Sequence, residues 1–122
     1  AVQMAAVTRN PRVIEFIKNP SVKLQMRAVT LEGQVLYFIK NPSPEVQMAA
    51  VKSDGDTIKL MRHPSEALQL AAVTQFGSSI RFIEHPSETV QLAAIRQHER
   101  AVYFIQNPTK RALNLHKLLW RK

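Results

Sequence analysis

The chain of 122 residues contains no cysteine, which excludes disulfide bonds and zinc sites built on thiolates. Its apolar runs fall well short of the roughly 18 consecutive residues that a membrane-spanning helix requires, so we expect no membrane span. Acidic residues are also scarce, since 9 Asp and Glu stand against 17 Lys and Arg and give a formal net charge of +8. This imbalance favours a polyanionic partner, although a role in solubility alone would also account for it.

No signal peptide is visible, and the lack of cysteine is compatible with a reducing compartment, so we expect a cytoplasmic location. The sequence begins with Ala1 inside a phrase that recurs later in the chain, and we therefore expect the natural array to extend upstream. Apolar residues make up 45% of the chain, which is typical of a folded protein and argues against disorder.

The chain does contain a strict 22-residue repeat. Its prolines recur at this spacing, each after Asn or His and before Ser or Thr: Pro20, Pro42, Pro64, Pro86 and Pro108. The phrase PSPEVQMAAV at residues 42–51 returns as PSETVQLAAI at residues 86–95. No gap is needed across five units, so we interpret the chain as one repeat domain. The units are 1–19, 20–41, 42–63, 64–85 and 86–107, followed by a C-terminal cap at 108–122.

We number each unit from its proline, which is position 1. The sequence pattern of each unit predicts two helices. The first covers positions 3 to 13, with the Ser at position 2 as its N-cap. Glycine at position 14 suits a left-handed residue that ends this helix, as at Gly33, Gly55 and Gly77. Pro11 and Glu99 replace it in the first and fifth units, so we expect those two turns to differ.

The second predicted helix covers positions 15 to 21 and has apolar residues at positions 16, 17, 19 and 20. The next proline stops it. We expect stacked units to share one core that contains Ile14, Phe16, Ile17, Leu36, Phe38, Ile39, Ile58, Leu60, Met61, Ile80, Phe82, Ile83, Val102, Phe104 and Ile105.

Neither helix would be stable alone at this length, so the fold must come from stacking. The predicted fold class is all-α: an α-solenoid, or superhelix, of about five two-helix repeats plus a C-terminal capping helix. In that capping helix we expect Ala112, Leu115, Leu118 and Leu119 to cover the last core layer. We expect the basic residues Lys117, Arg121 and Lys122 to meet water.

The phrase NPS-x-x-VQLAAV, followed by a glycine turn and a short second helix, resembles the leucine-rich repeat variant and short HEAT-like helical repeat proteins. The resemblance covers nearly the whole chain. It implies a helical solenoid and indicates no particular function.

We find no set of residues that predicts catalysis, a cofactor or a metal site. His63 and His85 lie one repeat apart, which is too far for both to bind one metal ion. Asp54 and Asp56 flank Gly55, and we interpret them as turn-forming residues. The serines recur as helix caps, so no Ser–His–Asp set can be argued and we expect no enzyme.

A glutamine occupies position 6 of every unit: Gln3, Gln25, Gln47, Gln69 and Gln91. We interpret this row as a structural ladder, in which each amide bonds to the loop backbone of the adjacent repeat. The alternative is that the amides contact an extended peptide or successive bases.

Positions 18 and 21 lie three apart and should share one face of the second helix. The face carries two acidic residues, Glu15 and Glu84, and a strip of cations and tyrosines that we take as the candidate binding surface: Lys18, Tyr37, Lys40, Lys59, Arg62, Arg81 and Tyr103. A second strip on the first helix is flatter and rich in alanine.

These features predict a non-enzymatic scaffold that binds a protein or an acidic peptide. Binding of the nucleic-acid backbone is an alternative, because lysine and arginine neutralise phosphates and tyrosine stacks on bases. A purely structural segment of a larger repeat array is a further alternative.

Overall fold

The computed structural model describes residues 2 to 120, and this part of the chain contains helices and no β-strand. Six α-helices alternate with five short 3-10 helices. The α-helices are α1 (Val2–Arg9), α2 (Val22–Leu31), α3 (Pro44–Ser53), α4 (Glu66–Gln75), α5 (Glu88–Gln97) and α6 (Lys110–Trp120). The 3-10 helices are η1 (Pro11–Phe16), η2 (Gly33–Phe38), η3 (Gly55–Leu60), η4 (Gly77–Phe82) and η5 (Glu99–Phe104). The predicted all-α fold class is therefore confirmed.

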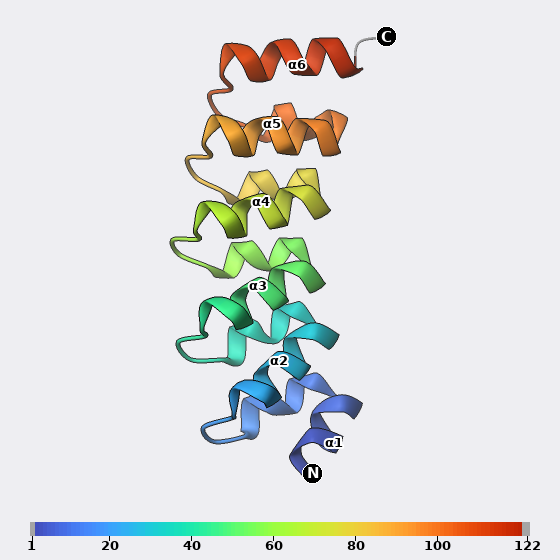
Figure 1. Cartoon of the computed structure of the whole chain (residues 1–122), viewed down its shortest axis with the longest axis vertical. Helices are drawn as coiled ribbons and strands as arrows, with labels where there is room; N and C mark the ends of the chain where they lie inside the picture. The colour runs from blue at the N-terminus through green and yellow to red at the C-terminus, as the bar shows by residue number, and fades with distance from the viewer. Residues whose placement is uncertain (1, 121–122) are drawn as a thin grey trace.

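The helices are stacked along one axis, from α1 at one end to α6 at the other (Figure 1). Each α-helix packs on the α-helices of the neighbouring repeats, and each 3-10 helix packs on the neighbouring 3-10 helices. The loops that join each 3-10 helix to the next α-helix lie along one edge of the stack (Figure 1). Contacts restricted to nearest neighbours are typical of a helical repeat protein.

The serine or threonine that follows each repeated proline begins an α-helix, as the sequence predicts. The hydroxyl oxygens of Ser21, Ser43, Ser65 and Ser87 each accept a hydrogen bond from the backbone N–H three residues later, at 3.2 to 3.3 Å. Thr109 caps α6 in the same way, through the N–H of Ala112 at 3.1 Å. These bonds satisfy N–H groups that the first turn of a helix leaves unpaired.

The second helix of each repeat differs from the prediction, because it is a 3-10 helix at positions 14 to 19 rather than a longer helix at positions 15 to 21. A 3-10 helix has three residues per turn, so residues three apart lie on the same side. The sequence fits this period. In η2 and the residue after it, Gly33, Leu36 and Ile39 are buried at this spacing, Val35 is buried as well, and Tyr37 is exposed.

The glycines at position 14 do not end a helix in a left-handed conformation, so that prediction is wrong. None of them has a positive φ, and each begins a 3-10 helix. A Cβ atom at Gly55 would lie 2.8 Å from the carbonyl oxygen of Ala72 in the next repeat. Glycine is therefore needed for the close approach of two backbones. The left-handed residues are instead Asn19 and Asn41, with φ of 50° and 48°.

The turns at Pro11 and Glu99 do not differ in the way that the sequence led us to expect. Each begins a 3-10 helix of six residues after an extended residue, as the glycines do. The first position of a helix accepts proline well because its N–H has no partner within the helix. Proline or glutamate in place of glycine at position 14 therefore leaves the length of the 3-10 helix unchanged.

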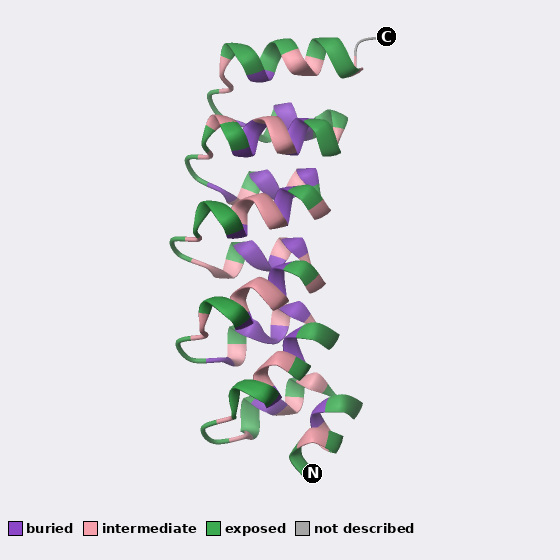
Figure 2. Cartoon of the chain, in the orientation of Figure 1, coloured by how far each residue is buried: buried purple, intermediate pink, exposed green. Residues whose placement is uncertain are grey.

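Buried residues lie along the middle of the stack, between the two kinds of helix (Figure 2). Half of the buried apolar residues in the described part of the chain come from positions 5, 9 and 10 of α2 to α5, which the sequence prediction omitted: Leu24, Ala28, Val29, Val46, Ala50, Val51, Leu68, Ala72, Val73, Val90, Ala94 and Ile95. Two predicted core residues lie at the surface, since Phe16 is 82% exposed and Phe104 is 38% exposed. The 3-10 helix turns position 19 partly outward, and Phe16 has no earlier repeat against it among the described residues.

The predicted covering of the last layer by α6 is only partly correct. Ala112 is fully buried and Leu115 is partly buried, but Leu118 and Leu119 are 81% and 46% exposed. Trp120 takes part instead, because its indole N–H donates a hydrogen bond of 2.7 Å to the carbonyl of Ile95. Lys117 is exposed as expected, whereas Arg121 and Lys122 lie outside the described residues.

Candidate binding surface

The 3-10 helices present position 18 of each repeat to solvent, and in η1 this position is the acidic residue Glu15. Tyr37, Lys59, Arg81 and Tyr103 occupy this position in η2 to η5 and are all exposed. Because neighbouring 3-10 helices pack on one another, these residues follow each other at steps of one repeat along the stack. The structure thus places four of the seven predicted strip residues in one row, which we call the position-18 row.

Aromatic rings of position 19 support the two cations of the position-18 row. The guanidinium carbon of Arg81 lies 5.0 Å from the centre of the Phe82 ring and 5.6 Å from the centre of the Phe104 ring. The Lys59 ammonium lies 5.8 Å from the centre of the Phe82 ring. These distances are within the range of cation–π attraction. The sequence prediction missed this role, because it assigned both phenylalanines to the core.

The two tyrosines at the ends of the row also contact aromatic rings. Tyr37 meets Phe38 edge to face, with ring centres 5.3 Å apart. Tyr103 meets His116 of α6 in a similar geometry, with ring centres 5.7 Å apart. Both tyrosines are nevertheless 74% exposed, so most of each ring is open to a partner.

The other predicted strip residues lie in the loops after the 3-10 helices. Arg62 and Tyr37 line one hollow between successive loops, together with Gln47 and His63. Arg62 also lines the next hollow, together with Glu84 and His85. Lys18 and Lys40 are exposed. The structure therefore brings Arg62 close to the position-18 row.

The cations of the candidate surface have no carboxylate partner among the described residues. The ion pairs of this part of the chain join other groups, Arg12 with Glu32 and Arg111 with Glu88. Glu84 lies 3.4 Å from the neighbouring His85 side chain. The positive charge of Lys59, Arg62 and Arg81 is therefore available to an external anion.

The glutamine row has a different geometry from the predicted ladder. The side-chain amides of Gln25, Gln69 and Gln91 each donate to the carbonyl of the proline that begins their own repeat, at 3.0 to 3.1 Å. Gln91 also bonds to the next unit, since its Oε1 accepts from the N–H of Thr109 at 3.0 Å. These three glutamines thus mainly fix the loop and helix start of their own repeat.

Position 12 of the α-helix provides bonds between repeats that the sequence prediction missed. Gln75 donates from Nε2 to the carbonyl of Lys52 at 2.7 Å, and Gln97 donates to the carbonyl of Gln75 at 3.1 Å. Ser53 donates to the carbonyl of Thr30 at 3.2 Å. The residue types differ between repeats, so a search for identical residues does not find this position.

Asp54 and Asp56 act in turns and helix caps. One carboxylate oxygen of Asp54 accepts from the N–H of Asp56 at 3.0 Å, and the other accepts from Gln34 of the preceding repeat at 3.0 Å. Asp56 accepts from the Ser79 hydroxyl at 2.6 Å. Within residues 2 to 120 no three histidine or acidic side chains gather as metal ligands would, and none of these helices is long and apolar enough to cross a membrane.

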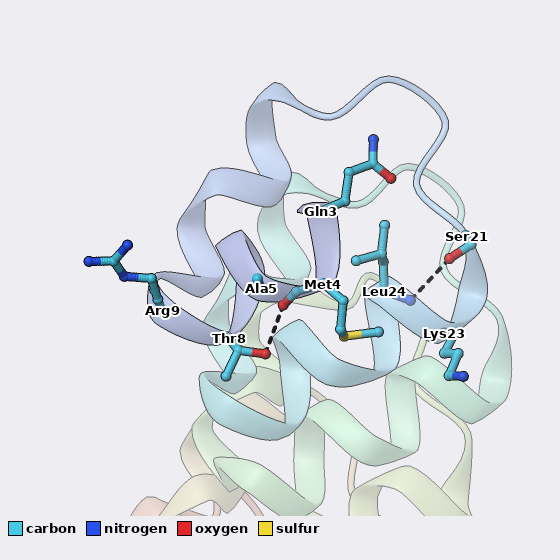
Figure 3. Close-up of a pocket in the computed structure, with 8 residues that line it drawn as sticks. All are labelled: Gln3, Met4, Ala5, Thr8, Arg9, Ser21, Lys23 and Leu24. Carbon is cyan, nitrogen blue, oxygen red and sulfur yellow. Dashed lines mark hydrogen bonds between the residues drawn. The ribbon is translucent and has the colours of Figure 1, made fainter. Parts of the chain in front are cut away.

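A hollow at the start of the stack lies between α1 and α2 (Figure 3). Its lining includes Gln3, Met4, Thr8 and Leu24, and the Thr8 hydroxyl donates to the carbonyl of Met4 within α1 at 2.8 Å. Arg9 also lines the hollow (Figure 3). Of the residues that the sequence analysis singled out as candidate site residues, Gln3 lines this hollow.

No protein-family model matches the chain, and neither a curated protein nor a solved structure was found to match it. The fold by itself defines the class, which is an all-α protein of tandem helical repeats.

Proposed function

We propose that the chain is a non-enzymatic scaffold that binds an acidic protein or peptide on the surface formed by its 3-10 helices. The observation that supports this most is the position of Arg81. Its guanidinium lies against two phenylalanine rings and has no carboxylate partner among the described residues. A planar guanidinium held in this way offers its N–H donors to a carboxylate with little further loss of side-chain freedom.

We also propose that the chain is related to the leucine-rich repeat variant or HEAT-like proteins. This part of the proposal is based on the repeated sequence phrase alone. The cytoplasmic location expected from the sequence stays a prediction. Nucleic acid remains the alternative partner, because phosphates would attract the same cations and tyrosine can stack on bases.

The test is fluorescence anisotropy with a labelled glutamate-rich peptide and with labelled DNA and RNA, single- and double-stranded, at low and moderate salt. The variant Lys59→Glu plus Arg81→Glu reverses two charges of the position-18 row. The control Lys52→Glu plus Arg96→Glu makes the same change in net charge on exposed residues of α3 and α5.

We expect the peptide to bind the original chain and the control, and the row variant to bind it at least about tenfold more weakly. Equal binding by both variants would show that this surface is not the site. Binding of nucleic acid but not of peptide would favour the alternative. In that case the logarithm of the binding constant should fall by about 0.7 to 0.9 per log unit of salt for each phosphate neutralised.

A further inference from the structure

The side chains of the position-18 row follow a definite order of aromatic and charged residues, which the net charge of the chain does not describe. Along the stack the row reads Tyr37, Lys59, Arg81 and Tyr103, so two cations lie between two exposed aromatic rings, and Glu15 of η1 precedes the row. Each member comes from the same position of consecutive repeats. Such a surface can distinguish the order of groups in a partner, and not only its total charge.

Every member of this row has an aromatic ring beside it, which favours one arrangement of the side chains. Phe82 lies close to both Lys59 and Arg81, and Phe104 lies close to Arg81. Tyr37 and Tyr103 each have an aromatic neighbour. A row that is already ordered favours a partner with matching spacing, because a mismatched partner must give up contacts or distort.

The spacing of the row follows from helix packing. Neighbouring packed helices lie about 8–10 Å apart, so consecutive members of the row should be separated by about this distance. A polyproline II peptide rises about 3.1 Å per residue and has three residues per turn. Side chains three residues apart therefore lie on one face of such a peptide, about 9 Å from each other.

We propose that the row binds an acidic peptide in the polyproline II conformation, with two carboxylates three residues apart and an apolar residue three residues beyond each. The carboxylates contact Lys59 and Arg81, and the apolar side chains pack on Tyr37 and Tyr103. This inference rests on the proposed function, and it adds the conformation and the register of the partner.

The test uses three labelled peptides of equal length and composition, each with two glutamates, two leucines and prolines elsewhere. In the first peptide the two glutamates are three residues apart. One leucine lies three residues before the first glutamate, and the other lies three residues after the second. The second and third peptides place the glutamates two and four residues apart instead of three. Anisotropy measures the dissociation constant of each peptide for the intact chain, with circular dichroism to confirm that every variant is folded.

We expect the first peptide to bind at least about tenfold more tightly than the other two. Arg81→Gln should remove this preference, whereas Lys52→Gln, an exposed cation of α3, should retain it. Tyr37→Ala plus Tyr103→Ala should weaken the first peptide at least about fivefold, and should not affect a version that has serine in place of both leucines.

If all three peptides bind similarly and the variant Lys59→Glu plus Arg81→Glu loses this binding, the proposed register is wrong. The proposed function is then still supported. Binding of nucleic acid with no binding of any peptide would overturn both. A preference for the first peptide that survives Arg81→Gln would show that the position-18 row does not read the spacing.

Discussion

At the scale of single residues, side chains join the repeats through backbone groups that helix ends and turns leave unpaired. Gln75 and Gln97 donate to carbonyls at the end of the preceding α-helix, and the amide of Gln91 bonds on both sides, to Pro86 and to Thr109. The last four carbonyls of an α-helix have no partner within the helix. These bonds therefore stabilise neighbouring repeats in one relative position.

The two kinds of glutamine contact predict a graded loss of stability. Gln69→Ala removes one partly buried hydrogen bond to Pro64 and should lower the free energy of unfolding by about 1 kcal/mol. Gln91→Ala leaves both the Pro86 carbonyl and the Thr109 N–H without this partner and should cost about 2–3 kcal/mol. Urea denaturation measures both values.

Gln106→Ala is the control for this pair, because Gln106 is exposed and should change stability by less than about 0.5 kcal/mol. Equal losses in the Gln69 and Gln91 variants would contradict the role assigned to the Thr109 contact.

Substitution of Gly55 tests why glycine is needed at position 14. Gly55→Ala should lower the free energy of unfolding by about 1–3 kcal/mol, because the added Cβ would lie 2.8 Å from the Ala72 carbonyl oxygen. Gly55→Asn should cost at least as much. If a left-handed backbone were the reason for glycine, asparagine would be tolerated better than alanine, and that result in thermal or urea unfolding would argue against the close approach.

At the scale of elements, each repeat pairs an α-helix of ten residues in α2 to α5 with a 3-10 helix of six. Such short helices depend on caps and on packing, because isolated helices of this length are marginal in water. The recurring serine cap and the proline before it define where each α-helix begins. The 3-10 helix then directs position 18 outward, and this produces the position-18 row.

The serine caps should each make a measurable contribution. Ser65→Ala removes the hydrogen bond from the N–H of Leu68, at 3.2 Å, and should lower the free energy of unfolding by about 1 kcal/mol. Ser65→Asp should retain most of the stability, because a carboxylate accepts the same bond and interacts well with the helix dipole. The two variants are compared by urea denaturation, and an equal loss in both would mean that the cap does not act through this bond.

At the scale of the whole molecule, residues 2 to 120 form a linear stack in which each unit contacts only its neighbours. The central units have a neighbour on both sides. In the described part of the chain, α1 has a packed helix on one side only and leaves Val2 84% exposed. Similarly, α6 leaves Leu118 exposed. In such a stack, local stability follows from the number of interfaces per unit.

This arrangement predicts a gradient of protection along the stack. Backbone amides of α3 and α4 should exchange with deuterium at least about tenfold more slowly than those of α1 and α6, because opening a central helix breaks two interfaces. Hydrogen–deuterium exchange with mass spectrometry measures this directly. Uniform protection from α1 to α6 would instead indicate that the stack unfolds as one cooperative unit.

The sequence by itself determined the repeat, the start of each α-helix and the fold class. The spacing of the prolines and the serine after each of them are local features, and their effect on the backbone is local as well. The candidate strip also followed from the sequence, because exposed positions that vary between units stand out from the repeated pattern. Whether these residues bind a partner stays a prediction.

Only the tertiary structure decided the type of the second helix, the reason for the glycines and the support of the cations. An apolar pattern of six residues fits both helix types, and packing against the α-helices selects between them. The approach of Gly55 to Ala72 and of Arg81 to Phe104 joins different repeats. Such contacts depend on the distance between stacked helices, which the spacing of residues within one repeat does not specify.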